Sequence, residues 1–387
     1  MHVSGSEHAF EEHLMRQALA LARRGEGCVE PNPMVGAVIA SASGDIIGEG
    51  WHEAFGGPHA EVAALSAAGT AARGGTLAVT LEPCCHHGKT PPCTAAIIAA
   101  GITRVIVGTR DPFPAVNGGG LVELTRAGVE VRVGVCETEA RRLIAPFRML
   151  VEQQRPWMIA KWAMSLDGRL AAAPGQDRWI SSGASRALVH DLRSRVDAIA
   201  VGIATALADD PLLTARPVEG SAAGPRQPLR IVLDGQAQLP LTSKLVQTAR
   251  QLPVLVAVGP QAPGDRLVAL EAAGCEIWQG GGADHAARTA ALLTELGRRR
   301  LTNLLVEGGP TLLAGMFAAD QIDEAWVFVA PLILGGGSAG GSPSLPDVPR
   351  LAVEDVSFPG GDVLIRGTIG APRITSPACL GSRFASG

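Results

Sequence analysis

Residues 80–93 read Thr80-Leu-Glu-Pro-Cys-Cys-His-His-Gly-Lys-Thr-Pro-Pro-Cys93, and the short motif His59-Ala-Glu61 precedes them. Zinc in proteins takes histidine nitrogen and cysteine sulfur as ligands, and a catalytic site uses three protein ligands with a fourth position open to water. The chain offers such a set in His59, Cys84 and Cys93, with the carboxylate of Glu61 beside it as a base. This stretch therefore predicts a catalytic zinc centre around which the first half of the chain is organised.

The local sequence has to bring His59 and Glu61 to one point. Two positions apart on a continuous helix, their side chains would diverge by about 200°. We therefore expect them at a helix start, which Pro58 favours. Pro91-Pro92 marks a second helix start at Cys93, and two helix N-termini would stabilise thiolates between them.

Cys85 is a rival to Cys84 as a ligand. The Pro83-Cys84 pairing favours Cys84, and successive side chains point apart, so both rarely reach one ion. The predicted chemistry follows from the ligand set, because zinc lowers the pKa of bound water towards about 7. Glu61 would take the proton of that water and deliver it to leaving ammonia. His-x-Glu followed by Pro-Cys and a second Cys is the signature of zinc-dependent nucleobase deaminases.

Composition narrows the class of protein. A chain of 387 residues predicts about two domains at roughly 150 residues each. A net charge of −4, only 4% aromatic residues and no tyrosine disfavour a nucleic-acid partner. Residues 1–12 do not resemble a signal peptide, and no apolar run reaches the roughly 18 residues that span a bilayer. We expect a soluble cytoplasmic protein without a membrane partner, whose seven cysteines stay reduced.

Hydrophobic periodicity predicts alternating elements in the first half. The predicted strands are 34–40, 46–51, 76–81, 103–108 and 129–135, and the predicted helices are 14–22, 59–68, 92–100, 121–127 and 137–151. This alternation is typical of an α/β layered domain with a partly parallel sheet.

The second half shows the same alternation after a polar connection at 150–156. Its predicted strands are 157–164, 198–202, 229–234, 254–258, 303–307 and 324–330, and its predicted helices are 185–194, 286–296 and 311–319. We therefore predict domains at 1–150 and 151–370, with 371–387 as a disordered tail rich in Ser, Ala and Gly. In Leu304–Gly315 a strand, two glycines and a helix start follow one another, which suits a cofactor phosphate but also fits an ordinary turn.

Several motifs of the first half closely resemble the bifunctional riboflavin-biosynthesis deaminase–reductase family. They are Asn32-Pro-Met-Val-Gly-Ala-Val, Gly50-Trp-His52, Pro58-His-Ala-Glu-Val, Thr80–Cys93 and Asp111-Pro-Phe-Pro. Eight residues separate Cys84 from Cys93, where many zinc deaminases place two. The resemblance implies a cytidine-deaminase-like three-layer α/β/α domain acting on a diaminopyrimidinone ribosyl phosphate. It implies substrate contacts from Asn32, His52, His86, Lys89 and Asp111, although the family usually has Ser at Cys85 and Asn at Phe113.

The second half resembles the reductase domain of the same family in Lys161–Arg169, Trp179-Ile-Ser, Ala208–Arg216 and Val306–Thr311. The resemblance implies a dihydrofolate-reductase-like α/β fold that uses NADPH. The implied NADPH contacts are Ala163, Trp179, Thr205, Asp209, Gly309, Pro310, Thr311, Leu312, Leu313, Ala314 and Gly315. The implied substrate contacts are Asp177, Arg193, Leu213, Arg216 and Glu307, with the arginines on the phosphate. Lys161 would be catalytic beside the sugar imine, and its alternative role is a structural ion pair.

The resemblance implies two consecutive reactions in riboflavin synthesis. Zinc-dependent deamination of 2,5-diamino-6-(5-phosphoribosylamino)pyrimidin-4(3H)-one precedes NADPH-dependent reduction of the ribosyl group of 5-amino-6-(5-phosphoribosylamino)uracil to ribityl. Two alternatives are a tRNA adenosine deaminase and a deaminase with a non-catalytic C-terminal binding module. The predicted partners are small phosphorylated pyrimidines, and a homo-oligomer remains open.

Overall fold

The computed structural model describes residues 5–86, 91–170, 180–216, 226–282, 284–335 and 350–370. The chain divides into two compact units, one of Met1–Trp157 with His190–Leu304 and the other of Met158–Val189 with Leu305–Gly387. Lys89, Asp177, Trp179 and the predicted tail 371–387 lie outside the described residues. The domain limits at residues 150 and 370 stay a prediction.

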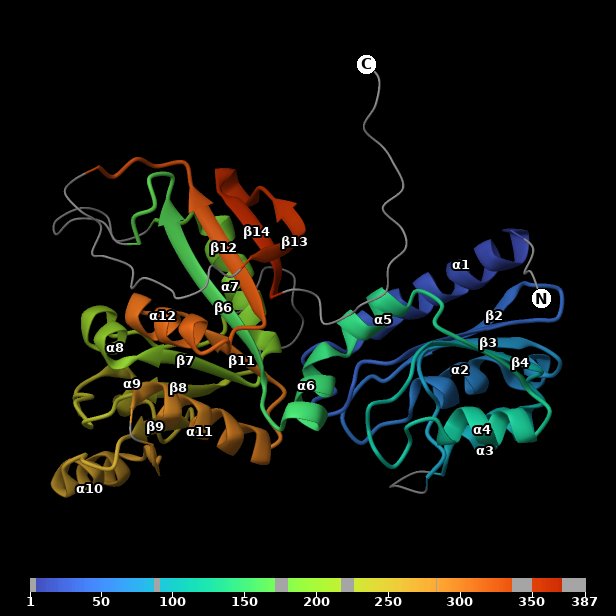
Figure 1. Ribbon diagram of the computed structural model, residues 1–387, viewed down its shortest axis with the longest axis horizontal. Helices are drawn as coiled ribbons and strands as arrows, with labels where there is room; N and C mark the ends of the chain where they lie inside the picture. Colours follow the sequence, from blue (N-terminus) through green and yellow to red (C-terminus); the bar gives the residue numbers. More distant parts are fainter. Residues whose placement is uncertain are drawn as a thin grey trace, which may run out of the picture. The chain divides into compact units, whose positions relative to one another are not determined.

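A five-stranded mixed sheet forms the N-terminal part of the first unit. Its strands are β1 (Gly36–Ala40), β2 (Ile46–Trp51), β3 (Thr76–Leu81), β4 (Arg104–Thr109) and β5 (Glu130–Val133). They lie in the order β2-β1-β3-β4-β5 (Figure 1). β1 is antiparallel to β2 and β3, whereas β3, β4 and β5 run parallel. The five strands predicted from the sequence are confirmed, with ends that differ by at most two residues.

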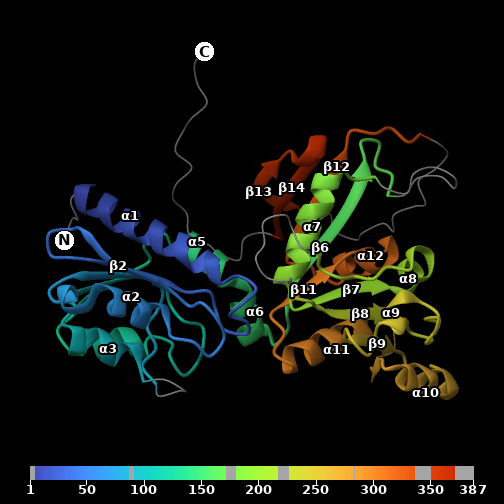
Figure 2. The same ribbon diagram turned by 180° about the vertical axis from the view of Figure 1, so that it is seen from behind.

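Helices cover both faces of this sheet (Figure 2). They are α1 (Gly5–Ala22), α2 (Ala60–Ala68), α3 (Cys93–Ala100), α4 (Gly119–Arg126) and α5 (Glu137–Leu143), and α6 (Ala145–Gln153) follows α5 without a buried residue. Alternate strand residues point to opposite faces. Ile39 and Leu77 therefore pack in one cluster with α2, α3 and α4, while Val38 and Ala78 pack in another with α1 and α5. The predicted three-layer α/β/α arrangement is confirmed.

The closing helix predicted at 137–151 is wrong, because the structure has two helices, α5 and α6, that break at Ile144. Pro146 explains the break. Proline has no N–H to donate to the carbonyl of Arg142, and its ring would clash with that carbonyl inside a continuous helix. Proline is favoured in the first turn of a helix, so α6 begins there. Residues 150–153, predicted as part of a polar connection, belong to α6.

Four further strands of the first unit run parallel to one another. They are β7 (Ala198–Gly202), β8 (Leu229–Leu233), β9 (Val254–Val258) and β10 (Glu276–Gln279), in the order β10-β9-β8-β7. The connecting helices are α8 (Ile203–Asp209), α9 (Lys244–Gln247), α10 (Gly264–Ala273) and α11 (His285–Arg298). The sequence predictions missed α8, α9, α10 and β10, three of which have seven residues or fewer. All carboxyl ends of these parallel strands lie at one edge, where α/β proteins bind ligands.

The second unit contains β6 (Trp157–Ser165), β12 (Glu324–Ala330), β13 (Leu351–Ser357) and β14 (Val363–Ile369). β12 is parallel to β6 and antiparallel to β14, which is antiparallel to β13. α12 (Pro310–Ala318) belongs to this unit, while α7 (Gly183–Arg195) and β11 (Asn303–Val306) continue from one unit into the other. The α/β class predicted for the second half is confirmed. No helix among the described residues is both long and apolar enough to cross a membrane.

Candidate functional site

Two helix starts and one strand end position the three potential metal ligands. His59 is the N-cap of α2, Cys93 is the first residue of α3, and Cys84 follows the end of β3. Each helix start is preceded by a proline, Pro58 or Pro92. The predicted helix starts at His59 and Cys93 are therefore confirmed, and the chain turns sharply enough for His59 and Glu61 to serve one site.

The geometry of the three side chains fits a tetrahedral zinc ion. His59 Nδ1 lies 3.2 Å from Cys93 Sγ and 3.6 Å from Cys84 Sγ. All three potential ligand atoms lie within 4.8 Å of one another. Bonds of about 2.0 Å to nitrogen and 2.3 Å to sulfur at tetrahedral angles would place such atoms about 3.5 Å apart. The residues thus match zinc in both chemistry and spacing.

The electrostatics of the cluster favour a thiolate at Cys84. The pKa of Cys84 is lowered to about 4, chiefly because the Cys93 thiol donates to its sulfur, with His59 as a further hydrogen-bond partner. The backbone N–H of Cys93 also donates to Cys84 Sγ at 3.4 Å. Burial raises the pKa of Glu61, which lies in the first turn of α2 and is 3% exposed. A sulfur that favours the thiolate form and a buried carboxyl thus belong to one site.

Asn32 and His52 form a pair beside the cluster. His52 Nδ1 lies 2.9 Å from the carbonyl oxygen of Pro58, which can only accept, so Nδ1 carries the proton. Burial lowers the pKa of His52, so the ring is neutral and Nε2 accepts from the Asn32 amide at 3.2 Å. The same histidine therefore orients Asn32 and holds the residue that precedes His59.

Asp111 and His86 lie on the loops that follow β4 and β3. Asp111 Oδ1 accepts from the backbone N–H of Phe113 at 2.8 Å, and burial raises the pKa of Asp111 to about 6. The rings of His86 and Phe113 lie 6.1 Å apart. Lys89, the predicted phosphate contact, is not among the described residues.

The sequence predictions missed Glu82, which is 3% exposed and accepts hydrogen bonds from four backbone N–H groups. One signal could have found it. A glutamate that directly follows the apolar strand Thr76–Leu81 is carried into the interior, where a carboxylate needs several donors.

The structure brings together Lys161 of β6 and Glu307, which follows β11. Lys161 Nζ lies 4.0 Å from Glu307 Oε2, and both side chains are largely buried. Ala163 lies two residues further along β6, and Gly309 is the N-cap of α12. Leu312 and Leu313 are buried residues of α12.

Five further predicted reductase residues belong to the first unit. Thr205 and Asp209 lie on α8, and Leu213 is buried with a φ of 54°. Arg193 donates to the carbonyl of Thr214 at 3.0 Å, which ties α7 to the segment carrying Leu213 and the exposed Arg216. Asp177 and Trp179 fall in a part of the chain that is not described.

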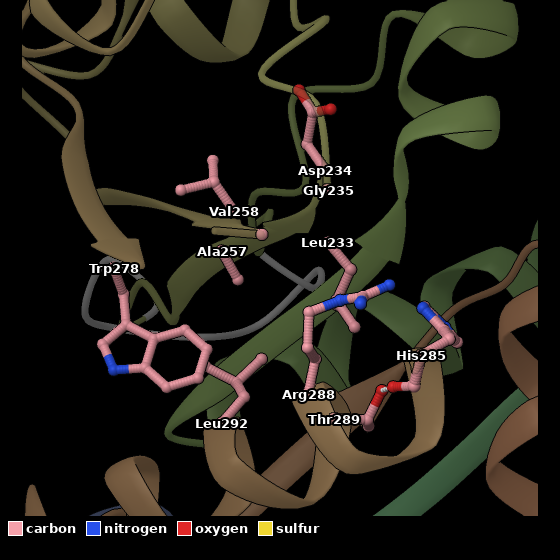
Figure 3. A pocket seen from close by; sticks show the side chains of 11 residues that line it. Leu233, Asp234, Gly235, Ala257, Val258, Trp278, His285, Arg288, Thr289 and Leu292 are labelled. Atoms are coloured by element: carbon pink, nitrogen blue, oxygen red, sulfur yellow. Dashed lines mark hydrogen bonds between the residues drawn. The ribbon is translucent and has the colours of Figure 1, made fainter. Parts of the chain in front are cut away.

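A pocket that no sequence motif indicated opens at the carboxyl ends of β8, β9 and β10 (Figure 3). Asp234 and Gly235 follow β8, Gly259 follows β9, and Trp278 lies on β10. His285 and Arg288, three residues apart in the first turns of α11, line the same pocket. Figure 3 shows the Arg288 side chain extending from α11 towards these strand ends.

Comparison with known proteins gives a family for each half. Residues 8–109 match the cytidine and deoxycytidylate deaminase zinc-binding region, and residues 156–361 match the RibD C-terminal domain. The riboflavin biosynthesis protein RibD of Aquifex aeolicus is 42% identical over 85% of this chain and 89% of its own. RibD of Escherichia coli is 38% identical over 92% of this chain and 98% of its own.

Solved structures agree with these relatives. Acinetobacter baumannii RibD superposes with a TM-score of 0.81 at 35% identity, covering 94% of this chain and 100% of that one. A Thermotoga maritima diaminohydroxyphosphoribosylaminopyrimidine deaminase/5-amino-6-(5-phosphoribosylamino)uracil reductase superposes with a TM-score of 0.79 at 36% identity, covering 94% and 99%.

Proposed function

The chain belongs to the RibD family and is a bifunctional deaminase and reductase of riboflavin biosynthesis that uses Zn²⁺ and NADPH, and from this premise we propose which residues perform each reaction. The observation that carries the proposal is the convergence of His59, Cys84 and Cys93 beside the buried Glu61. The order of the reactions is deamination of the diaminopyrimidinone ribosyl phosphate followed by reduction of the ribosyl group.

For deamination, His59, Cys84 and Cys93 would hold Zn²⁺, which supplies an activated water when bound. Glu61 accepts the proton of the nucleophile and delivers it to the leaving ammonia. The raised pKa of Glu61 suits a group that must both take up and release a proton.

Asn32, His52, His86, Lys89 and Asp111 bind the pyrimidine and its ribosyl phosphate. Because Asn32 donates through Nδ2 to neutral His52, its Oδ1 is left to accept from an amino or ring N–H of the pyrimidine. His52 acts through Asn32 as a positioning residue. Lys89 binds the phosphate as a point charge.

For reduction, the ribosylamine opens to an imine, and NADPH supplies the hydride that adds at the sugar C1. Lys161 provides a proton or positive charge near the imine nitrogen, while Glu307 orients the sugar hydroxyls. Arg193 and Arg216 bind the substrate phosphate, with Asp177 and Leu213 as further contacts. Ala163, Trp179, Thr205, Asp209 and the Gly309–Gly315 segment bind NADPH, whose phosphate is attracted by the start of α12.

The pocket at the carboxyl ends of β8, β9 and β10 takes the adenosine end of NADPH. Ligands of parallel α/β sheets bind at this edge. Arg288 gives a guanidinium suited to the 2′-phosphate that distinguishes NADPH from NADH, and His285 lies on the same face of α11.

The deciding experiment measures both half-reactions with the purified full chain. We expect ammonia release from the diaminopyrimidinone ribosyl phosphate and NADPH oxidation with the deaminated product. Ammonia release without NADPH oxidation would instead support a non-catalytic C-terminal module. Deamination of tRNA adenosine in place of the pyrimidine would support a nucleic-acid enzyme, which a net charge of −4 and 4% aromatic residues disfavour.

The enzyme is proposed to act in the cytoplasm on small phosphorylated pyrimidines, without nucleic acid and as a homo-oligomer. Cell fractionation tests its location. Light scattering of the purified chain tests its oligomeric state, and a mass of one chain would contradict the oligomer.

A further inference from the structure

The carboxylate of Glu82 connects two segments that are far apart in the sequence. Glu82 follows β3 directly and lies two residues before Cys84. Its Oε2 accepts from the backbone N–H groups of Asp111 at 3.3 Å and Gly118 at 3.0 Å. Its Oε1 accepts from those of Gly120 at 3.1 Å and Leu121 at 3.5 Å. One buried side chain thus accepts hydrogen bonds from both ends of the segment 111–121.

This arrangement gives α4 its N-terminal cap from a distant part of the chain. The N-cap residue Gly118 provides no side-chain hydrogen bond, so the first N–H groups of α4 need an outside acceptor. A carboxylate satisfies them and interacts favourably with the positive end of the helix dipole. Hydrogen bonds of backbone donors to a charged acceptor also offset the cost of burying Glu82.

The two segments are also in direct backbone contact. A Cβ atom at Gly120 would come within 2.1 Å of the Pro83 carbonyl oxygen, and one at Gly119 within 2.8 Å of Cys85 Sγ. Residues 82–85 and 118–120 therefore lie against each other with no room for side chains. A movement of either segment would displace Cys84 relative to Asp111.

We propose that Glu82 is a positioning residue of the deaminase, which fixes Cys84 and the substrate loop that begins at Asp111 in one geometry. Glu82 sets the position of the ligand Cys84 through the end of β3. It sets the position of Asp111 by accepting a hydrogen bond from the Asp111 backbone N–H. The inference rests on the zinc and substrate roles proposed above for Cys84 and Asp111.

Replacement of Glu82 by glutamine tests this role. Glutamine keeps the shape but offers one acceptor oxygen, and its NH₂ group would face one pair of backbone donors. We expect Glu82→Gln to weaken zinc affinity about tenfold, as other supporting residues of metal sites do, and to raise the KM for the diaminopyrimidinone by a similar factor. Zinc affinity is measured by competition with a chromophoric chelator, independently of turnover. The reductase half-reaction should remain unchanged.

Three variants make the test specific. Glu49→Gln makes the same chemical change on the exposed face of β2 and should match the wild type. Glu82→Asp keeps the charge with a shorter reach and should lie between wild type and Glu82→Gln. Gly120→Ala disturbs the same contact without changing charge, and it should also weaken zinc affinity and raise KM.

The inference is overturned if Glu82→Gln keeps zinc affinity and KM within about twofold of Glu49→Gln, even with a lower melting temperature. A second outcome would also overturn the inference. In it, Glu82→Gln loses both activities, while Glu82→Asp and Gly120→Ala keep their zinc affinity and KM. Glu82 would then be needed for folding alone. A wild-type chain that binds zinc but releases no ammonia would count against the proposed function. In that case zinc affinity still tests Glu82.

Discussion

Cys84 Sγ lies 3.6 Å from His59 Nδ1, whereas the sulfur of the adjacent Cys85 faces Gly119. Successive side chains in extended backbone point apart, so only one of the two cysteines can join His59 and Cys93. The pKa of Cys84 is lowered to about 4, while burial raises the pKa of Cys85. The two neighbours are therefore chemically different despite their adjacency.

We predict that Cys84→Ser loses zinc and deaminase activity, whereas Cys85→Ser keeps both within about twofold. Serine oxygen is a poor substitute for a thiolate ligand of zinc. Metal content by elemental analysis and ammonia release are measured for both variants, each of which differs from the wild type at one position. If Cys85→Ser lost zinc and Cys84→Ser retained it, Cys85 would be the zinc ligand in place of Cys84.

Glu61→Gln should abolish proton transfer while leaving the metal ligands in place. We predict that deamination falls by at least about 10², the usual contribution of a general acid/base, with zinc content unchanged. Reduction of pre-deaminated substrate should be preserved, and it serves as the control for folding. Equal loss of both half-reactions would contradict two independent sites.

The sequence was informative wherever local rules determine geometry. Pro58 and Pro92 predict helix starts because proline suits the first helical turn, and these starts place His59 and Cys93 in the structure. The role of Glu82 could not be predicted in this way. Its partners lie 29 to 39 residues away, and such pairings depend on how β3 and α4 meet in three dimensions.

In the second half, too, contacts between residues far apart in the sequence could not be predicted. Strands as apolar as Val254–Val258 are readily predicted, but the pocket beside them combines residues from β8, β9, β10 and α11. No short motif encodes that combination. The break between α5 and α6 is different, because Pro146 was available as a signal in the sequence.

Lys161→Ala tests the catalytic role of the Lys161–Glu307 pair. The two charged atoms are 4.0 Å apart and largely shielded from water, so the ammonium is held near its proposed site of action. We predict a fall in the reductase turnover of about 10² or more, with deamination unchanged. Lys244→Ala is the control, since Lys244 is an exposed lysine paired with Asp210. Near-normal turnover in Lys161→Ala would mean that Lys161 and Glu307 form only a structural ion pair.

Arg288→Ala should weaken binding of NADPH but not of NADH. Loss of a guanidinium–phosphate interaction of about 1.5–3 kcal/mol corresponds to roughly a 10- to 150-fold lower NADPH affinity. Fluorescence titration with both nucleotides measures the ratio, and Arg250→Ala, on an exposed arginine between β8 and β9, is the control. A parallel loss of affinity for both nucleotides would contradict recognition of the 2′-phosphate.

Glu30, two residues before Asn32 in the chain, has a largely buried carboxyl group without full hydrogen bonding. Its Oε1 accepts from the backbone N–H of Gly27 at 3.0 Å, but Oε2 has no hydrogen-bond partner among the described residues. Oε2 lies 3.6 Å from Arg226 Nη1. Burial raises the pKa of Glu30 from 4.5 to about 7, and the nearby Asp197 adds to this effect.

This raised pKa predicts a stability that declines with pH. Between pH 4.5 and about 7 the folded protein holds a proton on Glu30 that the unfolded chain has released. The stabilising contribution is fully present below pH 4.5 and is lost as the pH rises through about 7. The difference between the two pKa values corresponds to roughly 3 kcal/mol, as an upper bound.

Glu30→Gln cannot ionise and keeps an acceptor for Gly27. We predict that it raises the free energy of unfolding above wild type at pH 8, by up to about 3 kcal/mol, and changes it little at pH 5. Urea denaturation at the two pH values measures the effect, and Glu49→Gln at an exposed position of β2 should change stability equally at both. Destabilisation of Glu30→Gln at pH 8 would mean that the attraction between ionised Glu30 and Arg226 outweighs the cost of burying the carboxylate.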